Sequence, residues 1–124
     1  MSAIEEAKKL VTSHEQFVAA RDIPGILSNV ADDVVFLAPA MPLIEGHVAV
    51  RGLYEALFGM GDWEFTHDYS GASESGDLVL LHGVARGTVT SADQDSSPFA
   101  NNYMITARRA PSGGRTHHLT SDCY

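Results

Sequence analysis

Hydrophobic positions at the start of the chain recur at helical spacing. They lie three or four residues apart and a histidine interrupts them: Ile4, Ala7, Val11, His14 and Val18. This spacing predicts an amphipathic helix over residues 3–20, with the apolar face turned toward a core. Ser2 followed three residues later by Glu5 has the form of a capping box at the start of that helix.

Two further helices are predicted before the middle of the chain. Asp22 is a good N-cap, and Pro24 lies in the first turn, where proline is tolerated, so a second helix is expected to end near Ala31. A third apolar stripe predicts a helix over residues 48–58, ending at the glycines that follow. Between them, residues 33–38 have the composition of a strand, followed by a proline-containing irregular loop.

The second half of the chain alternates in the manner of β-strands. Strands are expected at residues 63–70, 77–90, 99–109 and 115–123, separated by turns rich in Gly, Ser and Asp at 71–76, 91–98 and 111–114. The element order is therefore α-α-β-α-β-β-β-β. Helices first and hairpin-linked strands last indicate an α+β fold, a curved antiparallel sheet with helices on one face. No repeat or boundary divides residues 1–124, which we interpret as a single domain.

Charge narrows the possible partners. The chain has 8 Lys+Arg against 16 Asp+Glu, a net charge of −8 with neutral histidines. A phosphate backbone or an anionic membrane surface repels such a protein, so neither nucleic acid nor a membrane is expected as a partner. The first residues lack the basic-then-apolar order of a signal peptide, which makes a cytoplasmic location the expectation.

Several local motifs follow this element order. The segment 26–33 enters the first strand, Glu45-Gly46 lead into the helix that carries Tyr54, and Gly76-Asp77 open a long strand. Together they resemble the ketosteroid isomerase-like and SnoaL-like polyketide cyclase branch of the nuclear transport factor 2-like superfamily. The resemblance implies a cone-shaped, cystatin-like fold whose sheet wraps the first helix around a pocket. It also implies a homodimer formed through the outer face of the sheet.

The functional positions of this superfamily carry over only in part. The resemblance places His14 where steroid isomerases have the tyrosine that donates to the substrate oxyanion, and Tyr54 where a tyrosine hydrogen-bonds that donor. Ala38 falls at the position of the proton-transferring carboxylate, and Ile105 near that of a second acid. An alanine cannot act as a general base, which argues against steroid isomerisation by that mechanism.

Three residues are candidate catalytic groups: His14, Tyr54 and Tyr103. An imidazole with an ordinary pKa of about 6.5 exchanges protons near neutral pH, or donates to a developing oxyanion. Tyr54 is expected to orient His14, and Tyr103 to donate a hydrogen bond to the substrate. The alternative is that His14 is a core histidine whose hydrogen-bonding needs Tyr54 satisfies.

The candidate binding residues come from several elements: His82, Arg86, Asn101, Phe17 and Leu119. On the strand predicted over residues 77–90, one face carries Leu80, His82, Val84 and Arg86, and we expect this face to line the pocket. The alternative is that this face forms a dimer interface, where Arg and His are also common. The spacing of the histidines matches no metal-binding motif, and no phosphate-binding loop follows a strand, so neither a metal nor a cofactor is expected.

These residues favour a small cofactor-independent enzyme that acts by proton transfer on an apolar, carbonyl-bearing or polycyclic metabolite. A non-catalytic ligand-binding or dimerisation module of the same fold is the alternative, and the loss of the carboxylate at Ala38 supports it. An epoxide-opening hydrolase or cyclase is a third hypothesis, and it requires Asp68 or Asp122 to turn into the pocket. The shape of the pocket distinguishes the first two hypotheses. An open cavity with inward-facing polar groups supports the enzyme, whereas a pocket closed by Phe17, Phe36, Phe65 and Leu119 supports the non-catalytic module.

Overall fold

The computed structural model describes residues 2–37, 41–109 and 117–123. Within β6 the backbone is described but not the side chains. The elements are α1 Ala3–Ala19, α2 Ile23–Ser28, β1 Val30–Leu37, β2 Ile44–Glu45, α3 Gly46–Met60, β3 Asp62–Ser75, β4 Leu78–Thr90, β5 Ser96–Arg109 and β6 His117–Cys123. This arrangement confirms the predicted α+β fold.

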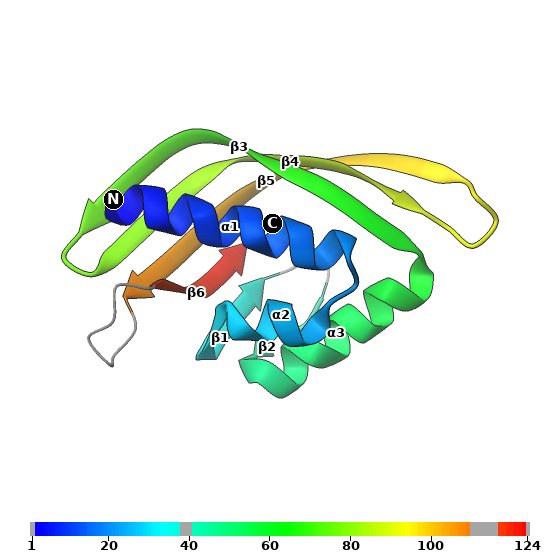
Figure 1. Ribbon diagram of the computed structural model, residues 1–124, viewed down its shortest axis with the longest axis horizontal. Coiled ribbons are helices and arrows are strands. Elements are labelled where there is room, and N and C mark those ends of the chain that lie inside the picture. The colour runs from blue at the N-terminus through cyan, green and yellow to red at the C-terminus, as the bar shows by residue number, and fades with distance from the viewer. Residues whose placement is uncertain (1, 38–40, 110–116, 124) are drawn as a thin grey trace.

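The described strands form one sheet in the order β2-β1-β6-β5-β4-β3. Neighbouring strands run antiparallel, except that β1 and β6 are parallel. As Figure 1 shows, the long strands β3, β4 and β5 arch over α1, while α2 and α3 lie together below it near β1. The sheet therefore curves around the first helix, as the cone-shaped fold requires.

The helix starts follow the predicted caps. The Ser2 hydroxyl accepts a hydrogen bond from the backbone N–H of Glu5 at 3.1 Å, and Asp22 accepts from that of Gly25 at 3.0 Å. The second helix ends earlier than expected, at Ser28, and β1 begins at Val30 instead of residue 33. Val30 pairs with β6, so a sheet contact remote in sequence overrides the local helical pattern there.

Other strand boundaries also differ from the predictions. The β3 strand continues through the predicted turn to Ser75, because β3 and β4 remain paired on both sides of a bulge between Tyr69 and Gly71. Only Gly76 and Asp77 are left to reverse the chain, and Gly76 has the positive φ of 61° that such a tight turn needs. A short β2 pairs with β1 in the segment predicted as irregular.

An arginine outside the predicted site joins the end of α1 to the end of α3. Arg21 has a left-handed backbone with φ of 58°. Its guanidinium donates to the backbone carbonyls of Phe58 at 2.7 Å and Gly61 at 3.1 Å, and pairs with Asp62 at 2.8 Å. These carbonyls belong to the C-terminal end of α3, where cations are favoured, so Arg21 acts as a side-chain cap for that helix.

Candidate functional site

A small cavity lies between α1, α3 and the strands β3 and β5. Its volume is about 150 Å³. Its lining is almost entirely apolar: Val18, Tyr54, Leu57, Phe58, Trp63, Phe65, Phe99 and Asn101. The aromatic walls contact one another, with ring centroids 5.7 Å apart for Trp63 and Phe99 and 6.4 Å apart for Phe65 and Phe99. The arrangement suits an apolar guest more than a charged one.

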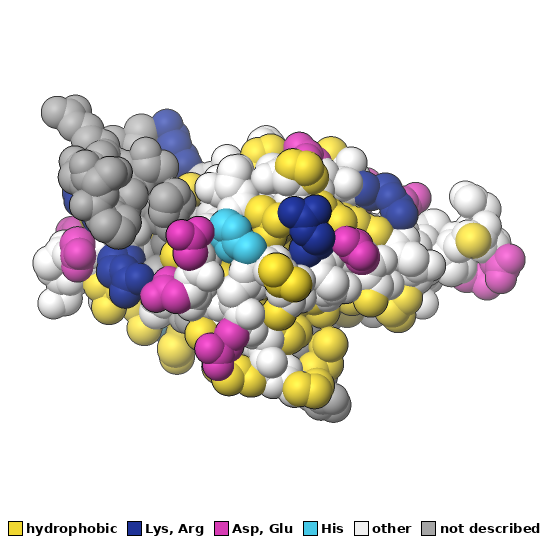
Figure 2. Space-filling view, turned by 90° about the horizontal axis from the view of Figure 1, so that it is seen from below, with side chains coloured by type: hydrophobic (Ala, Val, Ile, Leu, Met, Phe, Trp, Pro, Cys, Tyr) yellow, Lys and Arg dark blue, Asp and Glu magenta, His cyan; other side chains and the backbone are white. Residues whose placement is uncertain are grey.

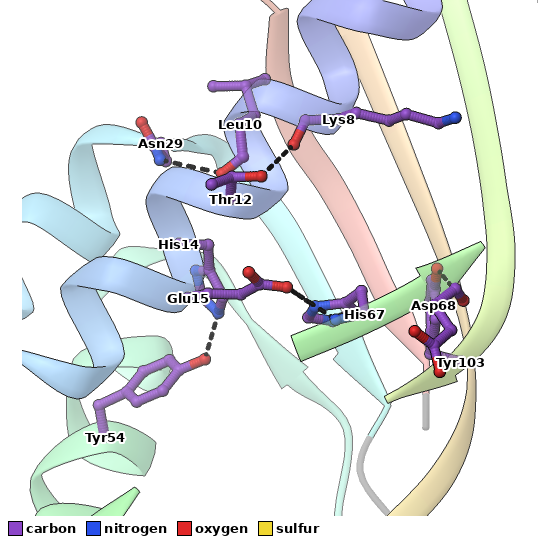
Figure 3. A network of polar contacts seen from close by, with 10 residues as sticks. All are labelled: Lys8, Leu10, Thr12, His14, Glu15, Asn29, Tyr54, His67, Asp68 and Tyr103. Carbon is purple, nitrogen blue, oxygen red and sulfur yellow. Dashed lines mark hydrogen bonds and ion pairs between the residues drawn. The ribbon is translucent and has the colours of Figure 1, made fainter. Parts of the chain in front are cut away.

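His14 lies behind this cavity and not on its wall. The side chain is 1% exposed, and its Nε2 shares a 2.8 Å hydrogen bond with the Tyr54 hydroxyl, as drawn in Figure 3. Tyr54 has its ring on the cavity wall, so it stands between His14 and the cavity. The structure thus brings His14 and Tyr54 together in direct contact.

Burial also controls the protonation of His14. The rings of Phe36, Tyr54 and Phe65 surround it edge-on at centroid distances of 5.8 to 6.5 Å. Desolvation and, as a smaller cause, the charge of His67 together lower the pKa of His14 from 6.5 to about 3. The imidazole is therefore neutral at physiological pH. Its Nδ1 has no hydrogen-bond partner among the side chains that the structure describes.

A second polar pair, which the sequence analysis missed, lies next to the first. Glu15 Oε2 accepts hydrogen bonds from both the backbone N–H and the Nδ1 of His67, each at 2.8 Å. Figure 3 shows His14 and Glu15 extending from α1 in different directions, one toward Tyr54 on α3 and the other toward His67 on β3. Because β3 is an edge strand, the carboxylate supplies a partner for a backbone N–H that no neighbouring strand takes.

Tyr103 and Asn101 share the inner side of β5 but have different surroundings. Tyr103 is buried, and its hydroxyl donates to the backbone carbonyl of Asp68 at 3.0 Å. Its ring packs edge-on against His67, with centroids 4.7 Å apart. Tyr103 is absent from the cavity lining, whereas Asn101 belongs to it. Of the two predicted substrate donors on this strand, only Asn101 is positioned to meet a molecule in the cavity.

The predicted inner face of β4 requires a correction. Val79, Leu81 and Ala85 are buried in the core, whereas His82 and Arg86 are exposed on the opposite face. The side chains of β4 alternate with the predicted period of two residues. Both faces carry apolar residues, however, so the period alone does not identify which face meets the core. Small residues on the inner face allow the close approach of β3, since a Cβ on Gly83 would overlap the Asp68 carbonyl.

Arg86 and His82 therefore do not line the cavity. Arg86 pairs with Asp68 on the outer face at 3.1 Å, with both side chains more than half exposed. This pair also places Asp68 outside, so it cannot be the inward carboxylate of an epoxide-opening enzyme. The alternative interpretation of this face as a dimer surface stays a prediction.

The remaining predicted residues either lie outside the described cavity lining or belong to parts of the chain whose side chains are not described. Phe17 is half-buried and lies against Gly25 of α2, where a Cβ would overlap its ring. Ala38 lies outside the described residues, and Leu119, His117 and Asp122 lie in β6, whose side chains are not described. Ile105 is a buried core residue. Within residues 2–37 and 41–109, no three His, Cys, Asp or Glu side chains are grouped so that they could hold a metal ion.

The surface near α2 and α3 is mixed in character. Figure 2 shows this side of the molecule, with hydrophobic side chains interspersed among acidic and basic ones. Val48 in the first turn of α3 and Met60 at the end of that helix are among the exposed hydrophobic residues, at 86% and 62%. Among the described helices, none is sufficiently long and apolar to span a bilayer.

Several solved structures have the same fold. A ketosteroid isomerase-like protein from Erwinia carotovora atroseptica is 18% identical with a TM-score of 0.84, covering 97% of this chain and 92% of that one. A conserved protein from Planctomyces limnophilus is 16% identical with a TM-score of 0.86, over 97% and 92% of the two chains. An NTF2-like protein of unknown function from Pseudomonas putida is 26% identical with a TM-score of 0.75, over 98% and 84%.

No curated protein matches the sequence significantly. A family model described as the SnoaL-like domain, however, matches residues 11–118. This range contains part of α1, part of β6 and all the described elements between them. The match agrees with the curved sheet, the enclosed first helix and the structural neighbours. The chain therefore belongs to the SnoaL-like domain family and shares its fold with ketosteroid isomerase-like and NTF2-like proteins.

Proposed function

We propose that this protein binds a small apolar molecule in the cavity between α1, α3, β3 and β5. The observation that carries the proposal is the cavity itself, about 150 Å³ with seven apolar or aromatic side chains and one amide in its lining. Contact between such walls and an apolar guest removes nonpolar surface from water, which stabilises the complex. Binding requires no charged group, and the buried His14 is neutral.

A cavity-filling substitution tests this proposal. Val18 is 2% exposed and lines the cavity, so in Val18→Phe the added ring atoms should occupy the space a ligand needs. With fluorobenzene as the probe, ¹⁹F NMR is expected to show binding to the wild type and at least about tenfold weaker binding to the variant. Val48→Phe is the matched control, because Val48 is 86% exposed on α3.

A wild-type measurement guards against a variant that fails to fold. Backbone ¹H–¹⁵N spectra recorded during the titration should show the largest shifts at Leu57, Phe65 and Phe99, which line the cavity on three different elements. Absence of fluorobenzene binding, or shifts confined to the outer face around Arg86, would contradict the proposed site.

The contact between Tyr54 and His14 favours a second candidate function, proton transfer at a carbonyl compound. In the sequence-based hypothesis, His14 was the acid, base or oxyanion donor and Tyr54 oriented it. The positions suggest exchanged roles, since Tyr54 lines the cavity while the neutral His14 hydrogen-bonds its hydroxyl. In this candidate the Tyr54 O–H donates to the carbonyl oxygen of the substrate and stabilises the enolate, and a water molecule takes the α proton.

Deuterium exchange tests the second candidate. With cyclohexanone in D₂O, the wild type is expected to accelerate loss of the α-proton NMR signal, and Tyr54→Phe to reduce that rate by about 100-fold or more. The affinity for fluorobenzene, measured in parallel, should change little in Tyr54→Phe because the aromatic ring remains. If the wild type does not accelerate exchange beyond buffer, the protein is a binding module for this class of compound and the enzymatic candidate fails.

A further inference from the structure

We infer that the ligand of this cavity is an uncharged molecule with a single aromatic ring and one hydrogen-bonding group, which Asn101 recognises. The inference rests on the proposed binding function and specifies its ligand. Three properties of the site carry it: the cavity volume, the charge of its surroundings and a polar side chain in its described lining, Asn101, that forms no hydrogen bond with the described part of the protein.

Volume restricts the number of rings. An apolar protein cavity of about 150 Å³ accommodates benzene, which makes this the scale of one six-membered ring and a small substituent. The cavity here has the same scale and rings on most sides, including Phe58, Trp63 and Phe99. Aromatic rings in tilted or edge-to-face contact stabilise one another beyond the effect of their buried area. A ligand with an aromatic ring is therefore favoured over an aliphatic one. A polycyclic metabolite, one of the substrates considered from sequence, would have to leave its further rings outside this space.

Charge excludes an anionic ligand. No Lys or Arg is present in the described lining, and burial of a carboxylate without a partner is costly. Arg21 contacts the outside of the Phe58 ring, 5.2 Å from its centroid, but its guanidinium is engaged by two carbonyls and Asp62. Arg86, expected from sequence to hold an acidic group, pairs with Asp68 on the other face of the sheet. The adjoining groove contains Glu15 and Glu64 beside Arg86, so it has no excess of positive charge to attract an anion.

Asn101 supplies the specific polar contact. The other polar groups of the described lining already hold a hydrogen bond within the protein, since the Trp63 indole N–H donates to the Leu57 carbonyl at 2.7 Å and the Tyr54 hydroxyl is bonded to His14. The Asn101 carboxamide makes no hydrogen bond to the described part of the chain and is solvent-exposed at the cavity. A carboxamide both donates and accepts, so it can bind a ligand carbonyl or hydroxyl at the entrance while the ring occupies the apolar interior.

Four probes separate these requirements in titrations followed by ¹H–¹⁵N NMR. Acetophenone has one ring and a carbonyl, ethylbenzene lacks the carbonyl, benzoate adds a negative charge and 2-acetylnaphthalene adds a ring. Acetophenone is expected to bind about fivefold more tightly than ethylbenzene, as one hydrogen bond allows, and at least about tenfold more tightly than the other two. In Asn101→Leu the preference for acetophenone over ethylbenzene should disappear.

Asn102→Leu is the matched control, since this asparagine is also exposed but is the next residue on β5 and therefore projects to the other face of the sheet. It should retain the fivefold preference. Equal or tighter binding of benzoate or 2-acetylnaphthalene overturns the inference while leaving the binding function intact. An unchanged preference in Asn101→Leu likewise overturns it, whereas failure of every probe to bind overturns the proposed function itself.

Discussion

Acidification is expected to destabilise this protein by about 1.4 kcal/mol per pH unit through His14 alone. The pKa of the buried imidazole is lowered to about 3, against 6.5 for the unperturbed group. Between these values the unfolded chain binds a proton at His14 that the folded protein does not. The stability is therefore fully present above pH 6.5 and is lost as the pH falls toward 3, a total on the order of 5 kcal/mol.

Urea unfolding at several pH values between 7 and 4 measures this effect. In His14→Gln the amide can still hydrogen-bond Tyr54 but does not titrate, so the slope of unfolding free energy against pH should decrease by about one proton. His82→Gln is the matched control because His82 lies on the exposed face of β4. Titration of surface carboxylates is common to all three proteins and cancels in the comparison.

The opposite result would be equally informative. If acidification stabilised the wild type relative to His14→Gln, the folded protein would hold the His14 proton more tightly than the unfolded chain does. That outcome would require an anionic partner for Nδ1, and would contradict the neutral imidazole on which the second candidate function depends.

A single methyl group on Gly83 is expected to have the second large effect. The Cβ of Gly83→Ala would overlap the Asp68 carbonyl and crowd the Ser70 backbone on β3, next to the bulge between Tyr69 and Gly71. Backbone atoms in a paired strand cannot move aside as a flexible side chain can. We expect a loss of about 3 kcal/mol or more in unfolding free energy, measured by chemical denaturation.

Gly52→Ala is the control, with the same chemical change and the opposite expectation. Gly52 lies within α3, is exposed, and has nothing within 4 Å of the position that a Cβ would occupy. Alanine there should raise the unfolding free energy by about 0.5–1 kcal/mol, because it lowers the conformational entropy of the unfolded chain and favours the helix. If Gly83→Ala and Gly52→Ala both had wild-type stability, β3 and β4 would not approach each other as closely at Gly83 as the structure has them.

The order of helices and strands was predictable because most of these elements have a signal in their own local sequence. The helical spacing from Ile4 to Val18 and the glycine-rich turns between strands are properties of neighbouring residues. The errors arose where a distant partner decides the structure. Val30 joins β1 because β6 pairs with it, and β3 passes through the predicted turn because β4 continues opposite to it.

The candidate site was also predictable only in part. The pairing of His14 with Tyr54 followed from the family resemblance, and the structure has their polar atoms 2.8 Å apart. The exposed position of Arg86 did not follow, because alternation defines two faces without saying which one meets the core. Glu15 gave no signal either, since a glutamate on an amphipathic helix usually faces solvent, and only the arrival of the β3 edge gives it two donors from His67.

The parallel pairing of β1 with β6 affects how the molecule is assembled during synthesis. In the sheet, β6 lies between β1 and β5, yet it follows all the other described strands in the sequence. Until β6 emerges from the ribosome, the β3-β4-β5 hairpins can form but the β1-β2 portion has no strand connecting it to them. Contacts this distant in sequence form late and slowly, leaving apolar surface exposed meanwhile. Until β6 pairs with both strands, the facing edges of β1 and β5 therefore have no strand partner between them.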